Sequence, residues 1–232
     1  MRIVVALGGN ALLKRGEPLD AAVQLGNVRR AARALAPITR DHQVIVTHGN
    51  GPQVGFLALQ SEGDPASRPL PLDVLGAETQ GMIGYMIEDE LRDALGGSRE
   101  LATVLTQVVV DADDPAFAAP TKPVGPVYEE REARELARKR GWSVAPDGAH
   151  WRRVVPSPEP RRIVEIAAIR ILVEAGVIVI CAGGGGVPVV REASGSLQGA
   201  EAVIDKDLCA ALLGSQLEAA VLLMLTDADA VY

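Results

Sequence analysis

The chain has 232 residues, of which 48% are hydrophobic, and carries a formal net charge of −7. This length and hydrophobic content suffice for one sizeable core with a smaller lobe. The acidic balance argues against nucleic-acid binding, and no apolar run or leader indicates a membrane or secreted protein. Cys181 and Cys209 fit no metal-binding or redox spacing. We therefore expect a reduced, cytoplasmic protein whose only metal arrives with a nucleotide.

The first third of the chain alternates predicted strands with predicted helices. Residues 2–7 and 44–46 are short, β-branched apolar runs, which are typical of strands that are covered on both faces. Between them, apolar residues recur at helical spacing up to about residue 41, behind Asp20, a favourable helix N-cap. Pro52 suits the first turn of the next helix, where its missing N–H has no partner to lose.

Each of these two strands is followed by a turn of small residues. The turn residues are Gly8, Gly9 and Asn10 after the first strand, and Gly49, Asn50 and Gly51 after the second. A backbone turn at a helix N-terminus offers free N–H groups and a favourable dipole to an anion. A tight turn without a ligand fits the local sequence equally well, so the turns alone leave both interpretations open.

The composition changes between residues 111 and 160. Eight of the 15 prolines and both tryptophans fall there, and residues 129–140 resemble a solvated, charge-laced helix. We interpret residues 111–160 as a lobe inserted at the strand ends, with a small aromatic core, because loops of this length are seldom structureless. A long surface loop is the alternative. Lys122 lies at the root of this segment, next to Pro123.

The flanking segments continue the α/β pattern. Residues 73–95 predict a long helix that ends at Gly96, and residues 103–110 predict a strand. A helix is expected from Ser157 and Pro158 to Gly176, a loop at residues 195–199 and a helix near residue 206. Residues 177–181 and 221–225 predict two more strands. The chain therefore predicts a single three-layer α/β/α sandwich with a mainly parallel sheet.

A third glycine turn, at residues 183–186, follows the strand that ends at Cys181. Turns after parallel strands meet at one edge of the sheet, where ligands bind in open α/β folds. No P-loop, dinucleotide-binding or nucleophile-elbow motif is present. The sharpest charge cluster is Asp205, Lys206 and Asp207, in which flanking carboxylates keep the lysine charged and held in place. An ordinary surface ion pair is the alternative interpretation.

Taken together, the motifs resemble the carbamate kinases, a branch of the amino acid kinase family. They are ALGGNALL at residues 6–13, THGNGPQVG at 47–55, TQGMIGY at 79–85, ATVLTQVVVD at 102–111, PTKPVGPVY at 120–128, WRRVVPSP at 151–158, GGGGVPVV at 183–190 and GAEAVIDKD at 199–207. The resemblance covers essentially the whole chain. The first and last motifs are shared with the wider family, whereas PTKPVGP and HGNGPQVG are more specific to carbamate kinases.

The resemblance implies reversible phosphoryl transfer between carbamoyl phosphate and ADP, giving ATP and carbamate, which breaks down to ammonia and carbon dioxide. It implies Mg²⁺ as the cofactor brought by ADP or ATP, a homodimer and a place in arginine breakdown. Carbamoyl phosphate is expected against the turns at residues 8–10 and 49–51. The resemblance assigns catalysis to Lys122, Lys206 and Asp207, and nucleotide binding to Lys206, Thr226 and Asp227. No nucleic acid or membrane partner is implied.

Members of the family continue beyond the position of Tyr232 with further sheet, a nucleotide-binding wall and another lysine. We therefore expect the carbamoyl phosphate side to be better represented than the nucleotide side, and apolar surface near residues 221–225 to be open. One alternative is a related kinase that makes a different acyl phosphate, which a panel of acceptors would identify. Another is a catalytically silent fragment that binds carbamoyl phosphate, which calorimetry would reveal as binding without turnover.

Overall fold

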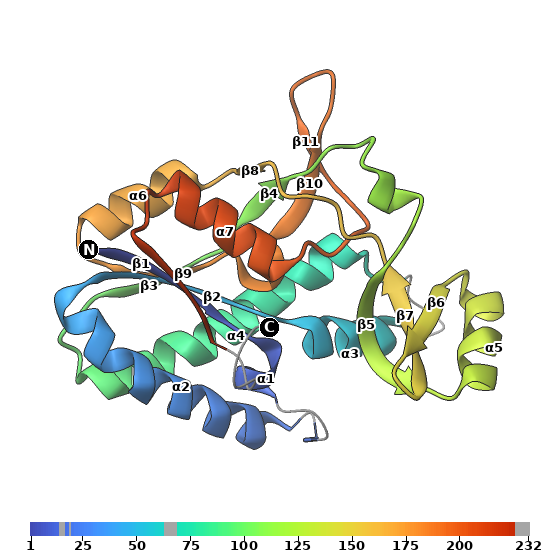
Figure 1. Cartoon of the computed structure of the whole chain (residues 1–232), viewed down its shortest axis with the longest axis horizontal. Helices are drawn as coiled ribbons and strands as arrows, with labels where there is room; N and C mark the ends of the chain where they lie inside the picture. The colour runs from blue at the N-terminus through green and yellow to red at the C-terminus, as the bar shows by residue number, and fades with distance from the viewer. Residues whose placement is uncertain (14–16, 19, 63–68, 226–232) are drawn as a thin grey trace.

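The computed structural model describes residues 1–13, 17–18, 20–62 and 69–225. Within them, five parallel strands form a central sheet in the order β12-β1-β2-β9-β3. Helices α2 and α4 cover one face and helices α6 and α7 cover the other (Figure 1). The bounds of these elements are β1 Arg2–Leu7, α2 Ala21–Asp41, β2 Gln43–His48, α4 Leu72–Leu95, β3 Leu101–Val104, α6 Ile166–Glu174, β9 Ile178–Cys181, α7 Lys206–Gln216 and β12 Val221–Leu225.

The central sheet is buried on both faces because successive side chains of a strand point to opposite sides. In β1, Val4 and Ala6 belong to the core formed with α6 and α7, whereas Val5 and Leu7 belong to the core formed with α2 and α4. The predicted three-layer sandwich with a mainly parallel sheet is therefore confirmed. At the edge strand β12, Met224 is 50% exposed, in agreement with the expected open apolar surface.

Local sequence signals define the ends of the longer helices. The Asp20 side chain accepts hydrogen bonds from the N–H groups of Ala22 at 2.8 Å and Val23 at 3.2 Å, so the predicted N-cap of α2 is confirmed. Helix α4 ends at the predicted place, with Gly96 as its C-cap. Two short elements follow the first two strands, namely α1 Gly9–Leu12 and α3 Gly51–Glu62.

The single strand predicted over residues 103–110 is wrong, because the chain there forms two strands in different sheets. Strand β3 ends at Val104 and strand β4 is Gln107–Val109. Between them, the Gln80 side chain accepts from the Thr106 N–H at 3.0 Å and donates to the Thr106 carbonyl at 3.1 Å. The buried Gln80 amide thus pairs with the Thr106 backbone at the point where the chain leaves the central sheet.

The helix predicted to start at Ser157 and Pro158 is also wrong, since α6 begins at Ile166. Residues 161–164 run beside β4 instead, and the N–H of Arg161 donates to Val109 O at 2.8 Å. Ile163 lies in strand β8, Arg162–Ile163. Pairing with β4 buries Ile163 completely, so this apolar residue belongs to a short buried strand and not to a helix face.

Strands β4 and β8 belong to a second sheet, in the order β11-β10-β4-β8. Its hairpin consists of β10 Val187–Arg191 and β11 Leu197–Gly199, paired antiparallel. The prediction of a loop over all of residues 195–199 is wrong, because residues 197–199 form the second strand of this hairpin. Three residues of alternating pattern are too short a signal to distinguish from a loop.

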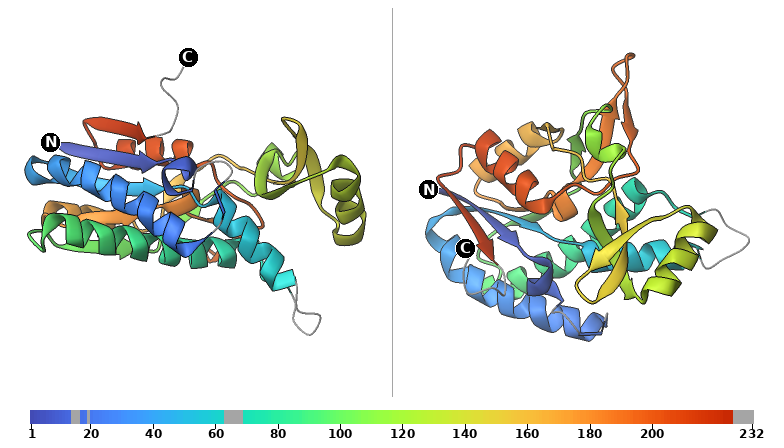
Figure 2. Two further views of the ribbon diagram at one scale, coloured as in Figure 1. Left: turned by 90° about the horizontal axis from the view of Figure 1, so that it is seen from below. Right: turned by 45° about the vertical axis from the view of Figure 1, so that its right-hand side comes forward.

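A third, antiparallel sheet in the order β5-β7-β6 carries helix α5 and protrudes from the sandwich (Figure 2). Its elements are β5 Lys122–Tyr128, α5 Glu130–Arg140, β6 Ser143–Asp147 and β7 His150–Val155. The guanidinium carbon of Arg134 lies 4.6 Å from the ring centre of Trp151. The guanidinium carbon of Arg153 lies 4.8 Å from the ring centre of Trp142. Cation–π contacts therefore cover both half-buried tryptophans. The boundaries of the lobe at residues 111 and 160 stay a prediction.

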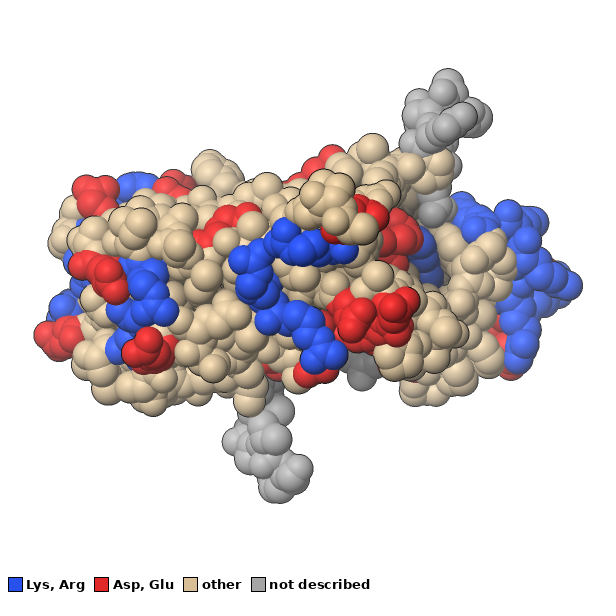
Figure 3. All heavy atoms as spheres, turned by 90° about the horizontal axis from the view of Figure 1, so that it is seen from above, with Lys and Arg blue, Asp and Glu red and all other residues tan. Residues whose placement is uncertain are grey.

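Charge is unevenly distributed over the face drawn in Figure 3, where basic side chains gather at the end formed by the protruding lobe. Over the sandwich on the same face, acidic and basic side chains are mixed. In the part of the chain that the structure describes, no helix is both long and apolar enough to cross a bilayer.

Candidate active site at the strand ends

A cavity of about 250 Å³ lies where the glycine turns meet the root of the lobe. Its lining consists of Gly9, Gly49, Asn50, Gly51, Pro52, Lys122, Pro123, Val124, Arg152, Gly184, Val203, Ile204 and Lys206. The cavity thus brings together one residue or more from each of the three predicted turns and both predicted catalytic lysines. Gly8 and Asp207 lie outside this lining. Asn10 is in α1, and its side chain lies outside the described part.

The turns after β1 and β2 rest directly against each other. A side chain at Gly49 would place its Cβ 3.1 Å from the backbone nitrogen of Gly9 and 3.4 Å from the Cδ of Lys206. The absent side chain therefore lets the backbones approach and leaves room for the stem of Lys206. Helix α3 starts at Gly51 in the cavity lining, so its first N–H groups lie at this edge of the sheet.

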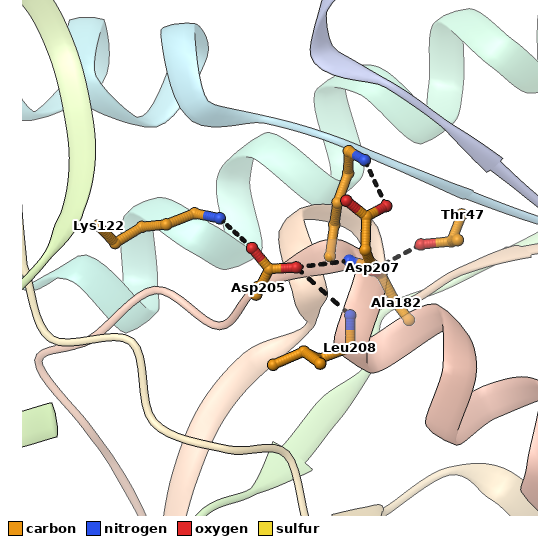
Figure 4. Close-up of polar contacts among 7 residues, drawn as sticks. Thr47, Lys122, Ala182, Asp205, Asp207 and Leu208 are labelled. Atoms are coloured by element: carbon orange, nitrogen blue, oxygen red, sulfur yellow. Dashed lines mark hydrogen bonds and ion pairs between the residues drawn. The ribbon is translucent and has the colours of Figure 1, made fainter. Parts of the chain in front are cut away.

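Lys122 reaches the site from the lobe and meets a carboxylate of the sandwich. Its Nζ lies 2.5 Å from Oδ2 of Asp205 (Figure 4). The other oxygen of Asp205 caps α7, because it accepts from the N–H groups of Asp207 at 2.9 Å and Leu208 at 3.3 Å. Burial acts to raise the pKa of Asp205, but Lys122 and the two N–H groups together hold it below its ordinary value.

Lys206 is held separately by its neighbour Asp207. The Nζ of Lys206 lies 2.6 Å from Oδ1 of Asp207, and both residues are in the first turn of α7. The resemblance assigned catalysis to Asp207 but singled out no role for Asp205, whereas the structure pairs Asp205 with Lys122 and Asp207 with Lys206. Asp205 is therefore a site residue that the sequence analysis missed as such. The signal that could have identified Asp205 is its position directly before an apolar helix, where an aspartate is a favourable N-cap.

A hydrogen bond to helix α4 fixes the orientation of the Asn50 side chain. Its Nδ2 donates to Oγ1 of Thr79 at 2.8 Å, and the Thr79 hydroxyl in turn donates to the carbonyl of Gly76 at 2.8 Å. Both side chains are buried, with exposed fractions of 4% for Asn50 and 0% for Thr79. A buried amide with a satisfied donor keeps one orientation, so Asn50 presents a fixed polar group to the cavity.

His48 precedes this turn but takes no part in the cavity lining. Burial lowers its pKa to about 4, while a hydrogen bond of its Nδ1 to the carbonyl of Gly49, at 3.0 Å, opposes the shift. The imidazole is therefore neutral at pH 7 and suited to packing under the turn.

Arg152 lines the cavity and is a second site residue that the sequence analysis missed. Its Nη2 donates to the Gly125 carbonyl at 2.6 Å, and its Nη1 lies 3.3 Å from Oδ2 of Asp147. Its Nε is buried and makes no hydrogen bond to the described residues. Arg152 is part of the WRRVVPSP motif. The sequence does not give the position of the lobe relative to the sandwich, so it gave no indication that Arg152 reaches the cavity.

Two predicted nucleotide-binding residues, Thr226 and Asp227, lie outside the described residues. Among residues 1–13, 17–18, 20–62 and 69–225, no group of three or more His, Cys, Asp or Glu side chains could hold a metal ion.

The chemistry that this arrangement supports is anion binding and charge neutralisation. Two ammonium groups, Lys122 and Lys206, converge over backbone turns at a helix N-terminus, and each is held by its own carboxylate. Lysine is a compact point charge that can follow a moving phosphoryl group. Phosphoryl transfer requires positioning and electrostatic stabilisation more than covalent participation, so these groups match its demands.

Known proteins resemble the chain along its whole length. A family model described as the amino acid kinase family matches residues 1–232. A carbamate kinase from Rhizobium meliloti is 57% identical over 234 aligned positions, which cover 100% of this chain and 72% of that protein.

Solved structures agree with the sequence comparison. A carbamate kinase from Giardia lamblia bound to citric acid matches with a TM-score of 0.93 at 43% identity, covering 97% of this chain and 75% of the other. A carbamate kinase from Giardia lamblia bound to AMP-PNP matches with a TM-score of 0.86 at 42% identity, covering 97% of this chain and 73% of the other. The site described above therefore lies in a fold shared with these enzymes.

Proposed function

The chain belongs to the amino acid kinase family, among its carbamate kinases, and we propose that it transfers a phosphoryl group between carbamoyl phosphate and ADP. The bond from phosphorus to the carbamoyl oxygen breaks, and a bond to the terminal oxygen of ADP forms. The products are ATP and carbamate, which decomposes to ammonia and carbon dioxide. The observation that carries this proposal is the convergence of Lys122 and Lys206 on one cavity lined by backbone turns.

In the proposed mechanism, carbamoyl phosphate lies against the turns that contain Gly9 and Gly49. Their backbone approach leaves space for a small anion, and the apolar lining formed by Val203 and Ile204 limits access of water. Lys122 and Lys206 neutralise charge on the phosphoryl oxygens as the group moves. Asp205 and Asp207 keep the two lysines in position.

We propose that Mg²⁺ enters with ADP or ATP, since the described residues contain no cluster of ligands that forms a metal site. When bound, the ion neutralises charge on the nucleotide phosphates. A relative from Giardia lamblia was solved with AMP-PNP, and this supports nucleotide binding by the fold. Thr226 and Asp227 stay our candidates for nucleotide contacts on the resemblance alone.

The deciding experiment measures ATP formation from carbamoyl phosphate, ADP and Mg²⁺ with a luciferase readout. Removing one electrostatic stabiliser of a transition state costs roughly 3–4 kcal/mol, so Lys206→Ala should lower turnover by about two to three orders of magnitude. Lys139→Ala is the matched control, because Lys139 is exposed on α5 in the lobe.

Each outcome of this assay is decisive. Activity in the wild type that is lost in Lys206→Ala and retained in Lys139→Ala supports the proposal. A loss smaller than about tenfold in Lys206→Ala removes that residue from the mechanism. A folded wild type that makes no ATP but binds carbamoyl phosphate in a calorimeter would identify a catalytically silent binding protein instead.

We propose in addition that the protein is a homodimer. Helix α4 leaves Val74, Met82 and Tyr85 exposed, with Tyr85 at 67%. Exposed apolar side chains on one helix are consistent with a covered surface in an assembly. Sedimentation of the wild type beside Tyr85→Asp tests the proposal, because a charge in a buried interface should give monomers.

We propose that the protein acts in the cytoplasm. Cys181 and Cys209 are free, and both are buried in the core between the sheet and helices α6 and α7. Burial raises the pKa of Cys209 to about 12, so it stays an unreactive thiol. Unpaired cysteines are the norm in a reducing compartment.

A further inference from the structure

The lobe touches the sandwich through an unusually close backbone contact. Gly55 of helix α3 faces Gly125 of strand β5, and the two elements lie side by side (Figure 1). A Cβ added at Gly55 would lie 1.9 Å from the Cα of Gly125 and 2.1 Å from its nitrogen. No flexible side chain could yield there, since both atoms belong to the backbone.

The space around Gly55 differs from that around Gly26 and Gly76, two glycines in other helices. A Cβ at Gly26 in α2 or at Gly76 in α4 would meet no atom within 4 Å. Ordinary contact starts at 3.4 Å, so any side chain at Gly55 requires the backbones of α3 and β5 to separate by about 1.5 Å. Gly55 therefore fixes the closest approach between the lobe and α3.

This contact is rigidly connected to the catalytic cavity on both sides. On the lobe side, Lys122 begins the strand that contains Gly125, and the guanidinium of Arg152 holds the Gly125 carbonyl at 2.6 Å. Val124 is 2% exposed and packs in one cluster with Val54 of α3. On the sandwich side, α3 starts at Gly51 in the cavity lining. A retreat at Gly55 would thus draw Lys122 away from the cavity.

We propose that Gly55 is a positioning residue for the phosphoryl transfer reaction, which sets how far the lobe carries Lys122 into the cavity. Its lack of a side chain, rather than any chemistry of its own, permits the 2.5 Å contact between Lys122 and Asp205. The inference rests on the proposed function, because its main readout is the rate of that reaction.

The test compares Gly55→Ala with Gly26→Ala in the ATP-forming assay. A displacement of about 1 Å can cost about a hundredfold in rate, so Gly55→Ala should lower kcat by about that factor. The KM for ADP should stay within about threefold of wild type, because the moved group is Lys122. Gly26→Ala should match the wild type in kcat, since its added methyl meets no neighbour.

A double-mutant cycle separates positioning of Lys122 from general damage. In a Lys122→Ala background, Gly55→Ala should change kcat by less than about threefold, because the group that it displaces is already absent. The Thr79→Val substitution acts through Asn50 and not through Lys122. In a Thr79→Val background, Gly55→Ala should therefore lower kcat by the full factor of about a hundred. Equal losses in both backgrounds would overturn the proposal, as would a Gly55→Ala protein with wild-type kcat.

A wild type without activity would instead refute the proposed function, so the two failures are distinguishable. If Gly55→Ala does not fold by circular dichroism, Gly125→Ala decides. Its Cβ would lie 3.5 Å from the Gly55 Cα, which preserves the approach, although φ of +72° makes the substitution strained. A folded Gly125→Ala protein should lose less than about tenfold in kcat, and a loss of about a hundredfold would overturn the inference.

Discussion

Asp205 performs two structural tasks, and substitutions at this position can separate them. One oxygen caps helix α7 and the other holds Lys122. Loss of an N-cap typically costs about 1 kcal/mol, and a partly exposed ion pair contributes at most about 1 kcal/mol. The pair is partly exposed here, at 30% for Lys122 and 33% for Asp205. Asp205→Ala should therefore lower the free energy of unfolding by about 1–2 kcal/mol.

Asparagine retains the cap but not the charge, so Asp205→Asn isolates the ion pair. In a chain of this size, 1 kcal/mol corresponds to about 2–4 °C in Tm. We expect Asp205→Ala to lower Tm by about 2–8 °C and Asp205→Asn by less than about half of that. Thermal unfolding followed by circular dichroism at pH 7 measures both, with Lys122→Met as the variant that lacks only the pair.

The dependence of Tm on pH is an independent test of the two tasks of Asp205. Because the pKa of Asp205 is lowered on folding, its charged interactions stabilise the protein above the ordinary value of 3.8 and are lost as pH falls through the folded value. The Tm of Asp205→Asn should therefore approach that of the wild type below about pH 3.8. An Asp205→Asn protein as unstable as Asp205→Ala at pH 7 would refute the division of tasks.

Two further predictions concern residues beneath the cavity. Burial lowers the pKa of His48 from 6.5 to about 4, so the unfolded state binds more protons in this range. The free energy of unfolding should fall by about 3 kcal/mol as pH decreases across it, and denaturant titrations of His48→Gln should show a flatter dependence. Thr79→Val leaves the Asn50 amide without its acceptor and should raise the KM for carbamoyl phosphate about tenfold, whereas Thr79→Ser should restore it. An unchanged KM in Thr79→Val would show that Asn50 needs no support from α4.

Sequence reasoning was accurate where local and tertiary preferences agree. The strand Arg2–Leu7 and the helix behind Asp20 have the predicted bounds, because a buried β-branched run and an N-cap are local signals that the fold reinforces. It failed at residues 103–110 and 157–165. There, Gln80 and strand β4 supply hydrogen bonds from segments that are distant in the sequence.

The site was predictable to a similar extent. The sequence left open whether the glycine turns bind an anion, and the structure shows that residues of all three turns line one cavity. The charge cluster at the start of α7 indicated a held lysine, and Lys206 does lie against Asp207. Asp205 and Arg152 were missed as site residues because their significance depends on the position of the lobe. The lobe connects to the sandwich through contacts between distant segments, and no local pattern encodes its orientation.

The resemblance to the carbamate kinases singled out Lys122 and Lys206 as catalytic residues. The sequence by itself determined the class of the fold and the turns at the strand ends. These features depend on residue type and spacing, which act locally on the backbone. Only the tertiary structure decided which carboxylate holds which lysine, and that Gly55 and Gly125 meet backbone to backbone. The physical reason is that these contacts join segments far apart in the chain, and their distances follow from packing as a whole.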